Sequence, residues 1–250
     1  MKIILSPAKR LNEKLANNSV KTTIPVFLDE SEQLIKILQK QTKQDILELM
    51  KLSSSLAELN YNRYKTWKKE NHKNARAAVF MFEGEAYRGL NVTSFNAQEL
   101  KILNQKLFIL SGLYGVLKPL DSILPYRLEM GIKLNNPKGK NLYDFWKTKL
   151  TTYINAELKN EQIINLASKE YASVIDFKQL KKPIIQIDFL QEKENKYKNI
   201  AIYSKRARGM MTAFIVKNEI EKQEDLRAFD LEGYYFNNKL SKENHLIFTR

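Results

Sequence analysis

Residues Leu107–Gly131 read LFILSGLYGVLKPLDSILPYRLEMG, a short apolar run that passes directly into a segment rich in glycine and proline. The run Leu107–Leu110 predicts a buried β-strand, because consecutive large apolar side chains suit a strand with both faces covered. Three of the chain's 8 glycines and two of its 6 prolines fall within residues 110–131. Open α/β sheets bind ligands at the carboxyl ends of their strands, so this junction is a candidate ligand site.

Helical and strand patterns alternate on both sides of this segment, without a repeat or a flexible linker. We therefore predict one α/β (mixed α+β) domain over residues 1–250, with a central mixed sheet, flanking helices and a helical lobe at residues 30–70. The expected strands are Lys2–Leu5, Asn74–Phe82, Gln162–Ala167, Pro183–Leu190, Asn199–Ser204, Tyr234–Phe236 and Leu246–Phe248. The expected helices begin at Asp29, Thr42, Ser53 and Asn96 and span Asn141–Leu158 and Ala207–Ile220.

Composition excludes several classes of protein. The 250 residues include 42 Lys+Arg, 28 Asp+Glu and no Cys, which gives a net charge of +14. Without thiols, the chain cannot be a thiol peroxidase, a cysteine-ligated iron–sulfur protein or a disulfide-stapled module. The two histidines, His72 and His245, stand too far apart for a dedicated zinc or iron motif, so we predict no metal and no cofactor. Carboxylates alone could still hold a hard cation. We interpret His72 as a surface residue and His245 as structural.

No apolar run approaches the roughly 20 residues of a membrane span. The first apolar run, Lys2–Leu5, is too short for a secretory signal and is closed by Pro7. We therefore expect a cytoplasmic protein that does not bind membranes. The charge excess is spread evenly along the chain and carried mostly by lysine. A solvated lysine surface and an anion-binding surface explain it equally well.

The glycine-rich segment is the first candidate anion site. Backbone N–H groups at Gly112 and Gly115 would approach an anion closely, and Lys118 and Arg127 would add positive charge. A proline-fixed connection whose glycines only make turns explains the same residues.

A second candidate cluster contains Lys205, Arg206 and Arg208, which follow a predicted strand and open a predicted helix. Basic side chains at a helix N-terminus oppose the helix dipole unless an anion or an acidic neighbour offsets them. Pairing with Glu83, Glu129 or Glu170 is the structural alternative. Lys9, delivered by the turn after the first strand, would join this cluster.

Two carboxylates are candidates for acid–base chemistry. Glu129 and Glu170 would form a general acid/base pair if the fold brings them together, with Tyr114 or Tyr126 as a proton relay. An ion pair between each glutamate and a buried arginine is the alternative. Ser168 is explained as the N-cap of a helix.

These segments together resemble the YaaA peroxide stress protein family of bacteria over essentially the whole chain. The strings that carry the resemblance are Lys2–Lys9, Phe82–Gly89, Leu110–Asp121, Pro125–Gly131, Asn165–Ser168, Glu170–Tyr171, Ala207–Gly209 with Lys205, and Gly233–Tyr234 with Phe236.

The resemblance implies a mixed α/β fold with a positively charged cleft and a helix-hairpin-helix element, for which Leu110–Leu117 is the local candidate. It also implies a DNA-binding role in limiting hydrogen-peroxide damage, associated with lower free intracellular iron. It implies no catalytic residues.

Two functions remain open. In the first, which we favour over an enzyme, the chain binds double-stranded or branched DNA largely without regard to sequence. The DNA-binding set is Lys9, Gly112, Gly115, Lys118, Arg127, Lys205, Arg206 and Arg208. In the second, the same basic cleft holds a small anionic, phosphorylated substrate, with Glu129, Glu170, Tyr114 and Tyr126 as the acid–base candidates. The oligomeric state does not follow from the sequence.

Overall fold

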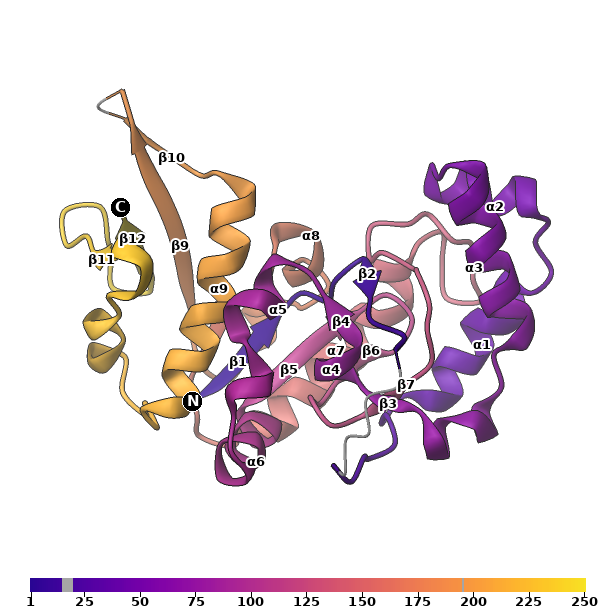
Figure 1. Ribbon diagram of the computed structural model, residues 1–250, viewed down its shortest axis with the longest axis horizontal. Helices are drawn as coiled ribbons and strands as arrows, with labels where there is room; N and C mark the ends of the chain where they lie inside the picture. Colours follow the sequence, from indigo (N-terminus) through magenta and orange to yellow (C-terminus); the bar gives the residue numbers. More distant parts are fainter. Residues whose placement is uncertain (15–19, 195) are drawn as a thin grey trace.

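The computed structural model describes residues 1–14, 20–194 and 196–250 (Figure 1). A central sheet runs in the order β11-β12-β9-β8-β1-β5-β6, with β10 paired to β9. The five strands β5, β1, β8, β9 and β12 are mutually parallel, whereas β6, β10 and β11 are antiparallel additions. The strands are β1 Lys2–Leu5, β5 Leu107–Ser111, β6 Gly115–Leu117, β8 Ile163–Leu166, β9 Ile184–Lys193, β10 Lys196–Lys198, β11 Tyr235–Phe236 and β12 His245–Thr249. The predicted mixed α/β sheet is confirmed.

The middle strands are buried because helices cover both faces of the sheet. Every residue of β5 and β8 is buried, as the apolar runs predict for parallel strands. In Figure 1, α9 lies in front of the sheet with α5 and α6 beside it, while α7 and α8 lie behind. The longer helices are α1 Leu28–Leu38, α2 Lys43–Met50, α3 Ser54–Thr66, α6 Ala97–Lys106, α7 Leu142–Leu158 and α9 Ala201–Lys217. Short helices are α4 Ala78–Met81, α5 Glu85–Leu90, α8 Lys169–Ala172, η1 Lys69–Asn74, η2 Val92–Ser94, η3 Phe177–Gln179, η4 Glu224–Ala228 and η5 Leu231–Gly233.

Side-chain caps set several helix starts where the sequence predicts them. Thr42 and Asn96 each accept a hydrogen bond from the backbone N–H three residues on, and the acid at that position bonds back to the cap. Ser53 and Asn141 cap α3 and α7 in the same way, without the return bond. Helices α1, α2 and α3 gather at one end of the molecule (Figure 1). They span most of residues 30–70, the range in which the sequence predicts a helical lobe.

Three local predictions were wrong. The apolar run 74–82 is not one strand: it forms β3 (Arg76–Ala77), the helical turn α4 and β4 (Phe82–Glu83), because a short buried run suits either a helix or a strand. Helix α9 already begins at Ala201, within the expected strand 199–204. The segment 110–117 is the β5–β6 hairpin, so a helix-hairpin-helix does not lie there.

Two small antiparallel pairs join the loops around the sheet. Strand β2 (Arg10–Leu11) pairs with β4, which places Arg10 opposite Glu83. Strand β3 pairs with β7 (Ser122–Ile123). The first pair holds the segment that follows β1 against the segment that precedes α5. Both segments line the candidate site described below.

Glycines allow α9 to cross α5 at very short distance. A Cβ atom at Gly209 would lie 1.8 Å from the carbonyl oxygen of Ala86, and one at Gly89 would lie 2.1 Å from the carbonyl oxygen of Arg206. Both obstacles are backbone atoms, which cannot move without shifting a helix. Gly209 therefore allows the close packing of the two helices. It lies in the interior of α9, whereas the sequence predicts a helix that begins at Ala207 and places Gly209 in its first turn.

His72 is buried, which corrects its interpretation as a surface residue. Its Nε2 lies 3.0 Å from the Tyr114 hydroxyl, and its Nδ1 lies 3.0 Å from the carbonyl oxygen of Lys69. The same hydroxyl accepts hydrogen bonds from Trp67 Nε1 at 3.2 Å and from the Leu124 N–H at 3.1 Å. Since a phenol has one proton to give, Tyr114 donates to a neutral His72. Burial lowers the pKa of His72 below its ordinary value.

We predict that Gly209→Ala lowers the free energy of unfolding by about 3 kcal/mol or more, at the upper end of overpacking costs, because α5 and α9 must separate. Gly233→Ala is the control, since an added Cβ there meets nothing within 4 Å and only the positive φ opposes it. Urea denaturation of both variants measures the difference. Equal small losses would show that the crossing tolerates a methyl group.

We predict that stability falls as the pH drops below about 6.5, the ordinary pKa of histidine. The pKa of His72 is lower in the folded state, so the unfolded chain binds the proton first and the folded state loses up to about 1.4 kcal/mol per pH unit from this group. His72→Gln should be less stable at pH 8 but lose less stability between pH 7 and pH 5 than the parent. Identical slopes in urea titrations would contradict this assignment.

Candidate functional site

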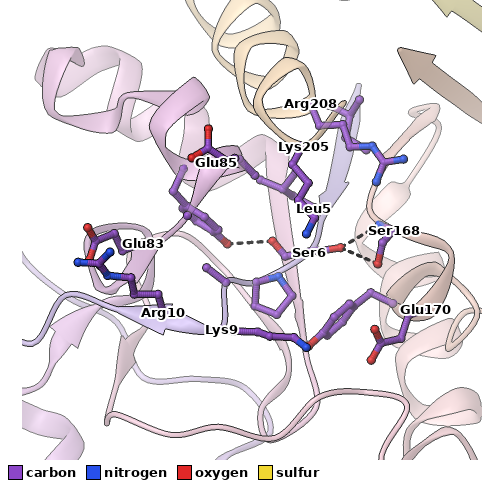
Figure 2. Close-up of a pocket in the computed structure, with 17 residues that line it drawn as sticks. Leu5, Ser6, Lys9, Arg10, Glu83, Glu85, Ser168, Glu170, Lys205 and Arg208 are labelled. Atoms are coloured by element: carbon purple, nitrogen blue, oxygen red, sulfur yellow. Dashed lines mark hydrogen bonds and ion pairs between the residues drawn. The ribbon is translucent and has the colours of Figure 1, made fainter. Parts of the chain in front are cut away.

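A cavity of about 340 Å³ opens at the carboxyl ends of β1 and β8 (Figure 2). The chain leaves β1 toward β5 on one side and leaves β8 toward β9 on the other side. The gap between β1 and β8 is therefore a topological switch point of the sheet. Four segments wall the cavity: the loop after β1, the β4–α5 junction, the β8–α8 junction and one face of α9. Its lining includes Ser6, Lys9, Arg10, Glu83, Glu85, Tyr87, Ser168, Glu170, Tyr171, Lys205 and Arg208.

Two serines join the strand ends at the cavity floor. Ser6 Oγ accepts a hydrogen bond from the Ser168 N–H at 2.8 Å, and the two hydroxyl oxygens lie 3.3 Å apart. The Tyr87 hydroxyl donates to the carbonyl oxygen of Ser6 at 3.1 Å. Ser168 precedes α8 as predicted, but its side chain makes no capping bond. The prediction that capping explains Ser168 was therefore wrong, and its hydroxyl faces Ser6.

Cations from two segments, the loop after β1 and α9, meet at this cavity. Lys9 lies 3.2 Å from Glu129, Arg10 lies 3.1 Å from Glu83, and Arg208 Nη2 lies 3.7 Å from Asp188. Lys205 is exposed and has no carboxylate partner among the residues that the structure describes. Figure 2 shows its ammonium directed from α9 toward the loop that carries Ser6. Lys205 is thus the cation most available to an anionic ligand.

Arg208 differs from the other cations because its side chain is mostly covered, with only 14% exposed. Its Nε has no hydrogen-bond partner among the described residues. Burial lowers the pKa of Arg208 and the Asp188 carboxylate opposes this shift, so the guanidinium remains charged at neutral pH. The part of Arg208 that lines the cavity approaches a carboxylate only at 3.7 Å and is suited to bind a second, anionic partner.

The structure places the two candidate carboxylates in adjoining hollows. Glu170 lies on the cavity wall, where one oxygen accepts a hydrogen bond from the Gly131 N–H at 3.0 Å. Glu129 lines a neighbouring crevice too small for more than a water, and its Oε1 contacts Arg127 at 3.0 Å and Lys9 at 3.2 Å. The predicted ion pair with an arginine holds for Glu129, although Arg127 is half-buried, whereas Glu170 accepts a hydrogen bond from the backbone.

Two tyrosines of the cavity wall, Tyr87 and Tyr171, are proton donors. Burial raises the pKa of each far above the ordinary value, and neighbouring tyrosines add to the effect. Both phenols therefore stay protonated near neutral pH, where they can donate hydrogen bonds but cannot act as bases.

The remaining predicted residues lie outside the cavity. Gly112 and Gly115 are buried in the β5–β6 hairpin, where a Cβ would meet the carbonyl oxygen of Leu128 at 2.2 Å and the Trp146 ring at 2.7 Å. Lys118 follows β6, which runs antiparallel to β5 and so ends on the side of the sheet away from the cavity. Its ammonium contacts Glu157 at 3.2 Å. The others are Arg206, which pairs with Glu232 at 2.7 Å, Tyr114 in the His72 network, and Tyr126, whose hydroxyl lies 2.6 Å from Ser111.

Arg206 and Arg208 also correct an electrostatic argument. Both lie in the second turn of α9, past its first four N–H groups, so the helix dipole does not make their position unfavourable. Neither pairs with Glu83, Glu129 or Glu170, which the sequence offered as partners.

Sequence reasoning missed Ser6, Arg10, Tyr87, Ser168 and Tyr171 as site residues. Ser6 and Ser168 each stand just beyond a predicted strand, which was the available signal. That signal becomes useful only when the two strands are known to be neighbours.

Among residues 1–14, 20–194 and 196–250, no group of three or more His, Asp or Glu side chains is placed to share a metal ion. In the same residues, no helix combines the length and apolar character needed to cross a bilayer.

The model of the family described as peroxide stress protein YaaA matches residues 1–240. The chain belongs to this family. Among its relatives, UPF0246 protein lpl1317 of Legionella pneumophila strain Lens is 45% identical over 255 residues, covering 100% of this chain and 99% of the relative. A UPF0246 protein of Flavobacterium johnsoniae is 45% identical over 252 residues, covering 100% of both chains. The family resemblance drawn from the sequence is confirmed.

Proposed function

We propose that this chain serves the peroxide stress response in the cytoplasm by binding a small anionic, phosphorylated molecule between the ends of β1 and β8. The observation that carries the proposal is the cavity itself, in which Lys205 lies beside the mostly covered Arg208 and has no carboxylate partner within the described residues. Its 340 Å³ fits the range of small-molecule sites. A DNA duplex, about 20 Å wide, does not fit inside it.

The lining supplies each interaction that a phosphate group requires. Lys205 and Arg208 provide positive charge, and the hydroxyls of Ser6 and Ser168 belong to the same lining as neutral hydrogen-bonding groups. Glu170 is the acid–base candidate if the ligand is transformed, because it lies in the same wall and one oxygen is held by backbone. Binding is the primary proposal, and catalysis by Glu170 is its extension.

We predict that phosphate-bearing ligands raise the melting temperature of the purified protein, and that Lys205→Ala and Arg208→Ala remove this effect. A ligand at one hundred times its Kd stabilises the folded state by about 2.7 kcal/mol, an effect that thermal scans resolve. The probes are inorganic phosphate, pyrophosphate and a set of sugar phosphates. Lys101→Ala is the matched control, since Lys101 is an exposed lysine of α6 and its loss changes the net charge equally. Equal ligand-induced shifts in all four proteins would overturn the proposal.

The same variants test the physiological role. In a strain that lacks the endogenous gene, the parent chain and Lys101→Ala should restore growth in hydrogen peroxide and lower the free iron measured by electron paramagnetic resonance. Arg208→Ala should do neither at equal protein level. Full protection by Arg208→Ala would separate the peroxide response from this cavity.

DNA is a second candidate ligand, and the cations at the cavity mouth favour it. The Lys9 and Arg10 side chains are 67% and 71% exposed on one loop, beside the exposed Lys205, and the chain carries a net charge of +14. Such a rim would contact the phosphates of double-stranded or branched DNA largely without regard to sequence.

We predict for this candidate that log affinity falls linearly with log salt concentration, and that Arg10→Ala reduces the slope by about 1 on any DNA sequence. Fluorescence anisotropy with duplex and four-way-junction probes between 50 and 200 mM salt, roughly the range over which phosphate contacts weaken strongly, measures both quantities. A flat salt dependence would eliminate DNA as the ligand and leave the small-molecule proposal standing.

A further inference from the structure

A second cavity, of about 320 Å³, lies on the other side of Arg208. Arg208 lines both cavities, so the two hollows flank a single guanidinium. The floor of the second cavity is formed by β8 and β9, where Asn165 and Gln186 stand directly opposite each other in the ladder.

Polar residues interrupt two apolar strands at this position. Strand β8 reads IINL and β9 begins IIQID, so Asn165, Gln186 and Asp188 break otherwise aliphatic runs. Asn165 is only 4% exposed. Burying an amide in a parallel sheet costs free energy unless its donors and acceptors are used, and apolar residues would serve the fold better there. Asn165 therefore calls for a role other than packing, whereas Gln186 and Asp188 lie on the half-exposed face of β9, within the lining of the cavity.

The protein uses only part of their hydrogen-bonding capacity. Asn165 Nδ2 donates to Gln186 Oε1 at 2.6 Å, and Asn165 Oδ1 accepts from the Ala167 N–H at 3.0 Å. Gln186 Nε2 reaches Asp188 Oδ1 only at 3.5 Å, and each amide nitrogen carries two protons. The Asp188 carboxylate is shared by His245 at 2.8 Å and Arg208 at 3.7 Å, which fixes it beside the amides.

The remainder of the lining comes from the β8–α8 junction, α8 and the segment that follows α8. It includes Phe177, a half-buried aromatic residue of η3. An aromatic ring and two amide side chains in one lining suit a flat heterocycle, which can stack on the ring and be read along its edge. A bare sugar or an inorganic anion would use only the polar floor.

We propose that the second cavity holds the base of a nucleoside phosphate whose phosphate group lies in the first cavity, with Gln186 reading the base edge and Arg208 between the two parts. This inference rests on the proposed binding of a phosphorylated molecule in the first cavity and names its class. The two volumes, 340 and 320 Å³, give each part of such a ligand its own hollow.

The test is isothermal titration of the full chain with the adenine, guanine, cytosine and uracil nucleoside 5′-monophosphates and with ribose 5-phosphate. We expect at least one nucleotide to bind tenfold or more tightly than ribose 5-phosphate. Gln186→Leu should remove that advantage and leave ribose 5-phosphate binding unchanged within twofold. Gln98→Leu is the matched control, an exposed glutamine of α6 whose replacement should change neither affinity.

The outcomes separate this inference from the proposed function. If ribose 5-phosphate binds as tightly as every nucleotide and Gln186→Leu changes nothing, the base site is refuted while the phosphate site stands. If no phosphorylated probe binds, both fail. Gln186→Glu keeps the size of the side chain and serves as a second variant if Gln186→Leu unfolds, as judged by its melting temperature. Unchanged nucleotide preference in Gln186→Glu would equally overturn the inference.

Discussion

The parallel pairing of β1 with β8 is the constraint on which the candidate site depends. It aligns Leu5 with Leu166, residues that are 161 positions apart, and so brings the two following loops to one edge of the sheet. The hydrogen bond from the Ser168 N–H to Ser6 Oγ continues the contact past the last ladder pair. Backbone polar groups at that edge are satisfied by side chains, and the hollow above them stays open to a ligand.

The candidate site also depends on the close crossing of α5 and α9. Gly89 and Gly209 let the two helices approach until backbone faces backbone. This contact brings the face of α9 that carries Lys205 and Arg208 over the ends of β1 and β8. Helix packing therefore sets the position of the basic residues of α9 at the cavity, independently of where the helix begins. The same contact places Glu85 and Tyr87 of α5 in the opposite wall.

The charge of the site is far smaller than the charge of the chain. Of the +14 net charge, the first cavity receives four cations, Lys9, Arg10, Lys205 and Arg208, against three acids, Glu83, Glu85 and Glu170. Three of the four cations have carboxylate partners within the described part of the chain, and Lys205 is the cation of this cavity that has none there. Specificity at such a site comes from the arrangement of neutral groups around few charges.

The class of fold, the family and most helix starts could be predicted without the structure, because these depend on local patterns. Such patterns are the apolar runs of β5 and β8, the capping residues Thr42 and Asn96, and the long strings shared with relatives. Reasoning from the sequence also selected Lys9, Glu170, Lys205 and Arg208 as candidate site residues, and these four line one cavity. Tertiary structure alone decided strand order, and with it the roles of Ser6 and Ser168. It also decided that Gly112 packs against Leu128 and that His72 is buried against Tyr114. The physical reason is that these contacts join distant parts of the chain, and no local pattern records which distant backbone a glycine or a polar side chain will meet.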